Sequence, residues 1–281
     1  MPQETTETRN VDDAVVRDFG EEWAQFDQSE LSDAERRRMF NQYFAIFPWK
    51  DLPRNSTGFD AGCGSGRWAM LVAPRVGHLH CFDPSLAINI AKKNLKHLHN
   101  CSFHQATVAD MPLADNSMEF GYSIGVLHHV PHTQSGITAC VRKLRRGAPF
   151  LVYLYYAFDN QPKWFRLIWK FSDMLRRLVS RLPYIPKYWV TQVLAGVVYF
   201  PLARVAKVLD SLGIDVRSFP LSSYRDRSFY SMRTDALDRF GTKLEKRFTR
   251  MQIQTMMENA GLEKIQFSTS VPFWCAVGFK K

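Results

Sequence analysis

From residue 56 onward, short apolar runs alternate with longer stretches of helical periodicity. Short apolar runs bounded by turn residues are typical of buried strands. Their regular alternation with helices favours parallel βαβ units and a doubly wound α/β sheet. The predicted strands cover about 56–61, 77–83, 101–107, 118–124 and 148–157, and the helices between them cover about 65–74, 84–97 and 133–145.

The region before the first strand, residues 11–54, also has helical periodicity. Ser32 and Glu35 have the spacing of a capping box, in which each side chain pairs with a free amide at the helix start. Pro48 ends the helix. The apolar residues that follow the cap on one helical face are Met39, Tyr43, Phe44 and Phe47.

The last segment of the chain predicts a helix followed by two strands. Thr249 begins the helix, with Gln252 in the reciprocal capping position and Gly261 just past the helix end. Two apolar runs, 263–268 and 273–279, then predict a pair of strands that completes the sheet.

The roughly ninety residues between the fifth strand and this last helix are too many for a structureless loop in a compact domain. We therefore expect a helical cap inserted into one α/β domain. The predicted parts are an N-terminal helical lid at 1–54, a core at 55–158, the cap at 159–248, and a final helix with two strands at 249–281.

The composition is that of an ordinary globular protein, with 46% apolar and 23% charged residues. This excludes a disordered chain, a collagen-like fibre and a small disulfide scaffold. Five cysteines without a C-x-x-C pair argue against a zinc site or a disulfide framework and favour the cytoplasm.

Residues 1–10 carry Glu4 and Glu7 and no apolar core, which predicts no signal peptide. The most apolar uncharged run, Tyr188–Ala203, is short for a membrane span at 16 residues.

The positive charge is concentrated in one window. Between residues 160 and 208, nine basic residues are opposed only by Asp173, so this window carries +8 of the net charge of +10. Such a patch predicts an anionic partner. Within it, Trp164, Ile168, Phe171, Leu175, Leu178 and Leu182 form one apolar face of a helix over 163–182. We favour packing of this face on the domain; the alternative is peripheral contact with an anionic membrane.

A glycine-rich turn follows the first strand, over Gly58–Gly66. Glycines allow a tight turn and the close approach of a ligand. The pattern is not the dinucleotide fingerprint, because Arg67 stands where that motif needs its third glycine. Asp60 lies just ahead of the turn, and Asp83 closes the second strand, where a carboxylate can accept both hydroxyls of a ribose.

Two further segments complete the pattern: Ala109-Asp110-Met111-Pro112 after the third strand, and Ser123 to His129 after the fourth. With them, the chain resembles the class I S-adenosylmethionine-dependent methyltransferases, in the small-molecule branch that includes quinone and sugar methyltransferases. The resemblance covers about 56–158 and, by topology, 249–280. It implies a seven-stranded, mostly parallel Rossmann-like sheet and S-adenosylmethionine as cofactor.

The resemblance also implies a role for each matching residue. Asp60, Gly62, Cys63, Gly64 and Gly66 would hold the methionine part of the cofactor; Asp83 and Pro84 the ribose; Asp110 and Met111 the adenine; and Ser123, Gly125 and Val126 would pass under the sulfonium. Residues 19–23 would fold over the cofactor as a lid or pack on the core. We expect Asp83→Ala to weaken cofactor binding with little effect on the stability of the ligand-free protein.

Methyl transfer from a sulfonium is an in-line displacement, so the protein mainly positions the acceptor. A base is needed only when the acceptor must lose a proton. His129 and His128, just beyond the fourth strand, are the candidate bases, and we favour His129; packing at the rim of the site is the alternative for both.

Polar residues of the cap are candidates for binding the acceptor, although a solvated loop is the competing interpretation. They are Tyr224, Arg225 and Tyr230, with Asp226 and Arg233 nearby. No metal is expected, because the histidine pairs His78/His80 and His97/His99 lack a carboxylate or cysteine at ligand spacing.

We therefore predict methyl transfer to the oxygen or nitrogen of a small-molecule or lipid-linked acceptor, in the cytoplasm or at the periphery of a membrane. One alternative is a catalytically inactive scaffold or regulator that binds S-adenosylmethionine. The other is an RNA methyltransferase. Nucleic acid is disfavoured as a partner because neither an Asp/Asn-Pro-Pro-aromatic tetrad nor a Pro-Cys pair follows the fourth strand. The oligomeric state stays open.

Overall fold

The computed structural model describes residues 10–281, which form two compact units. Unit one comprises the described residues up to 28, together with 36–157 and 244–281, and unit two comprises 29–35 and 158–243. Residues 1–9, which carry most of the prediction about a signal peptide, lie outside the described part.

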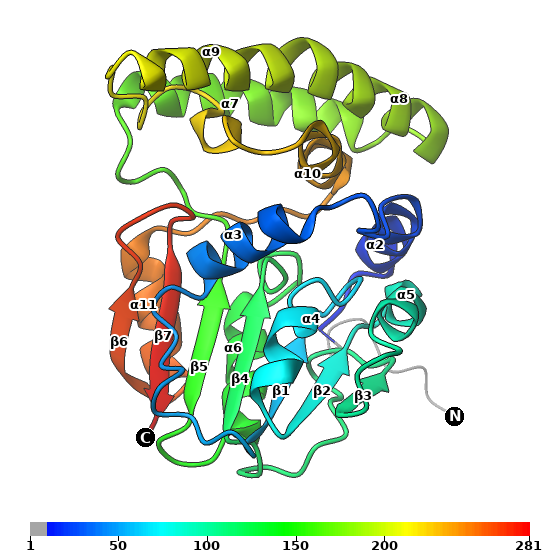
Figure 1. The fold of residues 1–281 in the computed structure, drawn as a ribbon, viewed down its shortest axis with the longest axis vertical. Coiled ribbons are helices and arrows are strands. Elements are labelled where there is room, and N and C mark those ends of the chain that lie inside the picture. The colour runs from blue at the N-terminus through cyan, green and yellow to red at the C-terminus, as the bar shows by residue number, and fades with distance from the viewer. Residues whose placement is uncertain (1–9) are drawn as a thin grey trace. The chain divides into compact units, whose positions relative to one another are not determined.

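A seven-stranded sheet forms the centre of unit one, as predicted. Its strands are β1 (Thr57–Ala61), β2 (His78–Phe82), β3 (Cys101–His104), β4 (Phe120–Ile124), β5 (Pro149–Tyr153), β6 (Leu262–Phe267) and β7 (Cys275–Lys280). They lie in the order β3-β2-β1-β4-β5-β7-β6, with only β7 antiparallel to its neighbours (Figure 1). The strand order reverses between β1 and β4, so the carboxyl ends of these strands border the crevice where open α/β sheets bind ligands.

The helices of unit one follow the predicted pattern with two corrections, the first being that the helix predicted to end at Pro48 already ends at Tyr43. The other helices are α2 (Asp13–Gln25), α4 (Ala69–Val72), α5 (Ala87–Asn94), α6 (Thr133–Lys143) and α11 (Arg250–Asn259), with the 3-10 turn η1 (Ala73–Arg75). The helix predicted at 65–74 begins only at Ala69, because Gly66 has a φ of +79°, which a right-handed helix does not allow. The capping box of α11 is confirmed: Thr249 Oγ1 accepts from the Gln252 amide at 3.2 Å, and Gln252 Oε1 accepts from the Thr249 amide at 2.9 Å.

The other predicted capping box is only half correct. At the start of α3 (Asp33–Tyr43), Ser32 Oγ accepts a hydrogen bond from the Glu35 amide at 3.2 Å. The Glu35 carboxylate does not return to Ser32; it accepts instead from the Ser228 amide at 3.0 Å and the Ser231 hydroxyl at 2.7 Å. The sequence spacing could not reveal these distant partners, which bind residues 29–35 to the rest of unit two.

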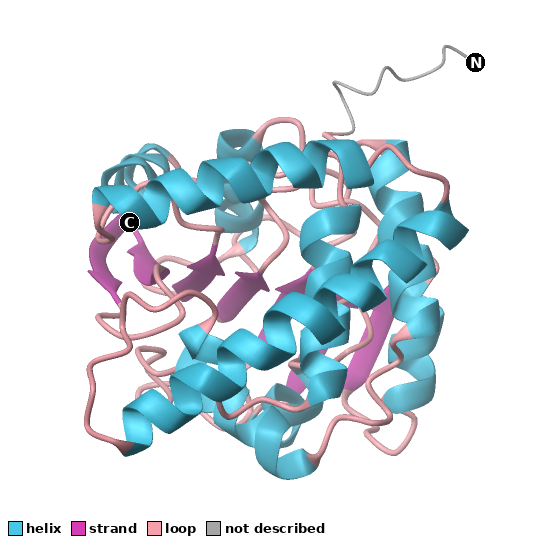
Figure 2. Cartoon of the chain, turned by 90° about the horizontal axis from the view of Figure 1, so that it is seen from above, coloured by secondary structure: helices cyan, strands magenta, loops and turns pink. Residues whose placement is uncertain are grey.

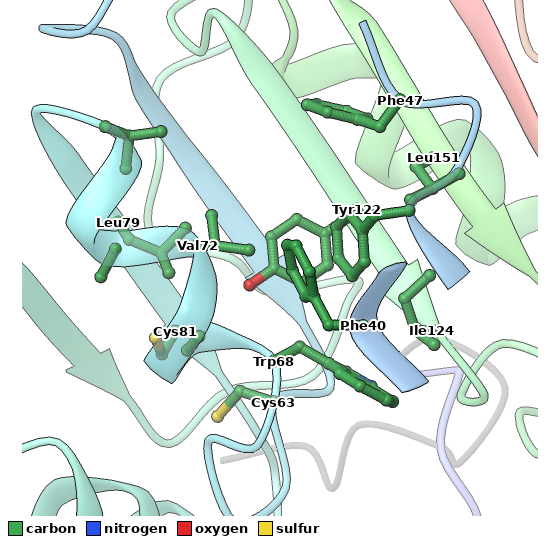
Figure 3. Packing of buried hydrophobic residues seen from close by; sticks show 14 of the residues in the cluster. Phe40, Phe47, Cys63, Trp68, Val72, Leu79, Cys81, Tyr122, Ile124 and Leu151 are labelled. Carbon is green, nitrogen blue, oxygen red and sulfur yellow. The ribbon is translucent and has the colours of Figure 1, made fainter. Parts of the chain in front are cut away.

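Two apolar clusters stabilise unit one. In the first, the α3 residues Phe40 and Phe44 pack with Trp68 and Tyr122, and Figure 3 shows Phe40, Trp68 and Tyr122 side by side. The second joins Phe59 and other sheet residues to α6 and α11. The sheet is thus buried on both faces, which explains why its parallel strands are continuous apolar runs in the sequence.

Unit two is helical, with a small core of its own. Its helices are α7 (Lys163–Val179), α8 (Tyr184–Leu194), the π-helical segment η2 (Ala195–Tyr199), α9 (Phe200–Ser211), the 3-10 turn η3 (Ser222–Tyr224) and α10 (Phe229–Gly241). The core joins Val179 of α7, Ala195 and Ala203, and Met232 and Phe240 of α10. Figure 1 shows α7, α8 and α9 on one side of α10.

The favoured interpretation that the apolar face of 163–182 packs on the domain is wrong. Phe171 is 69% and Leu178 60% exposed, whereas Asp173 and Arg176 are buried. The periodicity reveals an amphipathic helix but not which of its faces contacts the protein.

The segments α8, η2 and α9 are continuous. Tyr184–Ser211 is therefore a single helix of 28 residues, long and apolar enough to cross a membrane by length and composition.

Candidate functional site

The glycine turn after β1 is fixed by the neighbouring strand. The amides of Gly62 and Cys63 both donate to the carbonyl oxygen of Phe82 at 2.8 Å. Gly62 has a φ of +83°, and a Cβ added to it would lie 2.4 Å from Val126 Cγ2. A side chain at Gly62 would therefore be strained and would displace Val126, so the turn requires glycine at this position.

Asp83 joins the end of β2 to this turn. Its Oδ2 accepts a hydrogen bond from the Gly64 amide at 2.9 Å. Its Oδ1 accepts from the Ser85 amide at 2.9 Å and from the Ser85 hydroxyl at 2.6 Å. Burial raises the pKa of Asp83, and these bonds oppose the rise. The structure changes the expectation for Asp83→Ala, because the carboxylate also stabilises the ligand-free turn.

Asp60 lies inside the sheet, beneath the turn, and is 1% exposed. Burial raises its pKa to about 8; neighbouring Tyr122 acts against the rise, and the charge of Asp83 adds to it. Its Oδ2 has no hydrogen-bond partner among residues 10–281. Asp60 is therefore mostly protonated at neutral pH, when its carboxyl group can both donate and accept.

The end of β4 leaves open space beside the turn. The buried Ser123 hydroxyl donates to the Ala61 carbonyl oxygen at 2.8 Å, which joins β4 to β1. Two residues later, Gly125 has a φ of +76°, and a Cβ added there would meet no atom within 4 Å. Gly125 thus borders a space that a ligand atom could occupy close to the backbone.

The two predicted bases are both buried, with His129 5% exposed, and they differ in their contacts. His128 is completely buried and its ring stacks on Tyr155 with centroids 3.9 Å apart. Burial holds the pKa of His128 well below its ordinary value, so the ring is neutral. His129 Nδ1 lies 2.7 Å from the Leu244 carbonyl oxygen, which can only accept, so Nδ1 carries the proton and Nε2 is the basic nitrogen of the neutral ring.

Helix α2 lies across the glycine turn. Trp23 is so close to Gly64 that an added Cβ would lie 3.0 Å from its indole nitrogen, and Arg67 lies over the same ring at 5.6 Å. Phe19 contacts the ring of His129 edge to face at 4.9 Å between centroids. The segment 19–23 therefore covers the turn and the histidine together.

The residues predicted to bind adenine lie after β3. Asp110 is exposed and accepts from the Thr107 hydroxyl at 2.8 Å. Met111 is buried in the second apolar cluster, so its side chain serves the core. The Pro84 carbonyl oxygen accepts from Gln105 at 3.3 Å, which joins the loop after β2 to the end of β3.

The predicted acceptor residues belong to unit two and make contacts inside it. The ring of Tyr224 contacts Tyr199 edge to face at 5.3 Å. Arg225 forms an ion pair with Asp210 at 3.0 Å, and Tyr230 is buried. These contacts stabilise unit two, and the acceptor role of the three residues stays a prediction.

His78 and His80, the first of the histidine pairs rejected above as metal ligands, contact each other on β2 with ring centroids 4.7 Å apart. His80 Nδ1 lies 3.2 Å from His104 Nε2, and His78 Nε2 lies 2.9 Å from the Ser102 hydroxyl. Within residues 10–281, no group of three or more histidine, cysteine, aspartate or glutamate residues could hold a metal ion.

Comparisons with known proteins agree with this architecture. Residues 59–152 match the family model of a methyltransferase domain. No curated protein matches the chain. Among solved structures, the CurJ carbon methyltransferase is similar over 88% of this chain and 56% of its own, with 11% identity and a TM-score of 0.50. This likeness shows a shared fold.

Two other structures are similar over smaller parts. The N-methyltransferase NodS from Bradyrhizobium japonicum, in complex with S-adenosylhomocysteine, aligns with 50% of this chain and 72% of its own, at 18% identity and a TM-score of 0.42. The [4+2]-cyclase SpnF aligns with 41% of this chain at 21% identity and a TM-score of 0.37. The chain spans 43% of SpnF, less than half of that protein.

Proposed function

We propose that this enzyme methylates an oxygen or nitrogen atom of a small or lipid-linked acceptor, because residues 59–152 match the family model of a methyltransferase domain. Its cofactor, S-adenosylmethionine, supplies a methyl group already activated on a positively charged sulfur. One observation carries the proposal: the glycine turn, Asp83 and the open space at Gly125 meet at the carboxyl ends of β1, β2 and β4. Open α/β sheets bind their ligands at this position.

The residues at this edge fit the cofactor. Asp83 accepts three hydrogen bonds, and a carboxylate offers about four acceptor positions, so one remains for a ribose hydroxyl. Gly125 leaves a space that a Cβ would fill. Asp110 is exposed and can accept from the adenine amino group. Each part of the cofactor thus has a chemically suitable neighbour.

The proposed contacts group by cofactor part. Asp60, Gly62, Cys63, Gly64 and Gly66 hold the methionine end, Asp83 and Pro84 the ribose, Asp110 the adenine, and Ser123, Gly125 and Val126 the region of the methyl group. Met111, predicted to pack on the adenine ring, supports this region from the core. Ser123 and Val126 act by positioning, since the first joins β4 to β1 and the second packs against Gly62.

His129 is the proposed general base. With Nδ1 donating to Leu244, Nε2 presents a lone pair that can take a proton from a hydroxyl or ammonium acceptor. His128 is completely buried, and its ring lies tilted against that of His129 with centroids 4.0 Å apart, so we assign it a role in positioning the His129 ring. Tyr224, Arg225 and Tyr230 stay candidates for acceptor binding from unit two.

The experiment that tests this function uses S-adenosylmethionine labelled on its methyl group. Purified protein and labelled cofactor are incubated with a demethylated total cell extract, which is then separated into lipid, nucleic-acid and water-soluble fractions. Label in the lipid or the water-soluble small-molecule fraction supports the proposal. His129→Gln tests the base, and His97→Gln, an exposed histidine on the α5 side of unit one, is the matched control.

The other outcomes contradict the proposal. Label in the nucleic-acid fraction would make the protein an RNA methyltransferase. Cofactor binding without transfer to any fraction would make it a scaffold or regulator.

For the location of the enzyme, we propose the cytoplasm, because five cysteines without paired spacing suit a reducing compartment.

A further inference from the structure

Helix α7 buries the charged residues Asp173 and Arg176 and exposes most of its large apolar side chains. Arg176 donates to Asp173 at 2.7 Å and to the Thr242 carbonyl oxygen at 2.9 Å, and both charged residues are buried. The opposite side is the α7 face, made of the exposed residues Trp164, Leu167, Ile168, Phe171, Met174, Leu175, Leu178 and Leu182. An amphipathic helix in water has the reverse arrangement.

A second exposed apolar stripe runs along the continuous helix after α7. This α8–α9 face consists of Ile185, Trp189, Val193, Val197, Val205, Val208 and Leu212, with Ile185 71% and Trp189 63% exposed. The inner sides of both helices meet α10, since Val179, Ala195 and Ala203 share a core cluster with its residues. Both faces therefore lie on the side of unit two away from α10 (Figure 2 looks down on these helices).

Together, the α7 face and the α8–α9 face expose more large apolar side chains than soluble monomers usually do. Single exposed apolar residues are ordinary, but contiguous patches mark sites of contact with a partner or a membrane. The residues are exposed although α7 buries a charged pair beneath them. The arrangement therefore fits surroundings less polar than water.

Charge identifies the partner. Lys163, Arg166, Lys170, Arg177 and Arg181 are spaced by three, four, seven and four residues, so they form one exposed stripe along the edge of the α7 face. The only acidic residue between 160 and 208, Asp173, is buried and pairs with Arg176 and, at 2.9 Å, with Arg177. The charge offered to a partner therefore comes mainly from Lys163, Arg166, Lys170 and Arg181. A second copy of the chain would bring like charges together, whereas anionic lipid headgroups complement the stripe.

We propose that unit two docks on an anionic membrane surface, with the α7 and α8–α9 faces in the apolar boundary layer and the cationic stripe at the headgroups. Tyr184–Ser211 lies along the surface and does not cross it, because its inner side packs on α10 and includes the buried residues Lys187 and Thr191. Resting on the proposed methyltransferase function, this docking implies a lipid or lipid-linked acceptor, taken up from the membrane.

The first test measures sedimentation with vesicles, in the absence of S-adenosylmethionine. Wild-type protein should sediment with phosphatidylcholine vesicles that contain phosphatidylserine, and far less with phosphatidylcholine alone or at high salt. Because no methyl transfer is measured, failure here overturns the docking and leaves the proposed function intact. Conversely, an inactive protein that binds vesicles would overturn only the function.

Matched variants test each element of the surface. One variant removes four cations from the stripe: Lys163→Gln/Arg166→Gln/Lys170→Gln/Arg181→Gln. The matched control removes four exposed cations from unit one: Lys50→Gln/Lys92→Gln/Lys96→Gln/Arg146→Gln. One cation near the surface changes binding about fivefold, so the first set should weaken binding by more than about tenfold and the second far less. Equal losses would make the attraction a matter of net charge and overturn the stripe.

The apolar faces are tested by Leu167→Gln/Phe171→Gln/Leu178→Gln, which should abolish vesicle binding without lowering the melting temperature, since all three side chains are exposed. Brominated lipid in the vesicles should quench tryptophan fluorescence, and Trp164→Phe/Trp189→Phe should lose most of the quenching. Unchanged vesicle binding of the triple variant would overturn the proposal, and so would retention of the protein on vesicles after an alkaline carbonate wash. A third contradicting result is a wild-type protein that forms a dimer and does not bind vesicles, with the triple variant monomeric.

Discussion

The backbone amide of Gly64 donates a hydrogen bond to Oδ2 of Asp83 at 2.9 Å, which connects the glycine turn after β1 to the end of β2. The carboxylate expected to bind ribose is thus also part of the turn expected to bind methionine. Loss of this one side chain would disturb both ends of the proposed cofactor site.

Asp83→Ala should weaken cofactor binding and also destabilise the ligand-free protein. It leaves the Gly64 and Ser85 amides without their acceptor, and a buried unsatisfied donor costs about 1–3 kcal/mol. Calorimetric titration and urea unfolding measure the two effects. Asp110→Ala is the control, since its exposed carboxylate should affect binding but change stability by less than about 0.5 kcal/mol. Unchanged stability of Asp83→Ala would contradict the structural role.

Asp60 should make the ligand-free protein less stable as the pH rises. Its pKa is raised from 3.8 to about 8, so between these values the unfolded chain releases a proton that the folded protein keeps. Stability should fall across this range by at most about 1.4 kcal/mol per pH unit and level off above it. Asp60→Asn should flatten the dependence, although the raised pKa of Asp83 leaves a remainder of the same sign. Equal slopes for the two proteins in urea unfolding at pH 5, 6.5 and 8 would refute the assignment.

His129→Gln should lower kcat by about 10²–10⁴-fold when the acceptor must lose a proton. The affinity for S-adenosylmethionine should stay nearly the same, because the histidine acts on the acceptor. The measurement is the initial rate of label transfer into the fraction that accepts it, compared with His97→Gln. A rate equal to that of this control would remove His129 from the mechanism.

The local parts of the fold could be predicted from the sequence. The parallel strands are short apolar runs, and the Thr249–Gln252 cap lies within one helical turn, so neighbouring residues contain the information. The glycine turn was recognised from spacing, and its geometry agrees: Gly62 and Gly66 have positive φ angles.

Features that depend on distant partners could not be predicted. The Glu35 carboxylate binds Ser228 and Ser231, almost two hundred residues away in the chain. The buried pair of Asp173 and Arg176 turns the apolar side of α7 outward, which periodicity alone cannot show. Likewise, the dual role of Asp83 became visible only when β1 and β2 lay side by side.

The central claim is that the cofactor lies against the ends of β1 and β4, and titration of S-adenosylmethionine into three proteins tests it most directly. Gly125 and Gly147 have φ angles of +76° and +77°, and an added Cβ meets nothing within 4 Å at either. Alanine at either position should therefore cost a similar free energy of unfolding, about 1–2 kcal/mol. The account predicts that Gly147→Ala binds like the wild-type protein and that Gly125→Ala binds at least about tenfold more weakly, because its methyl group enters the cofactor space. Wild-type affinity in Gly125→Ala would contradict the account.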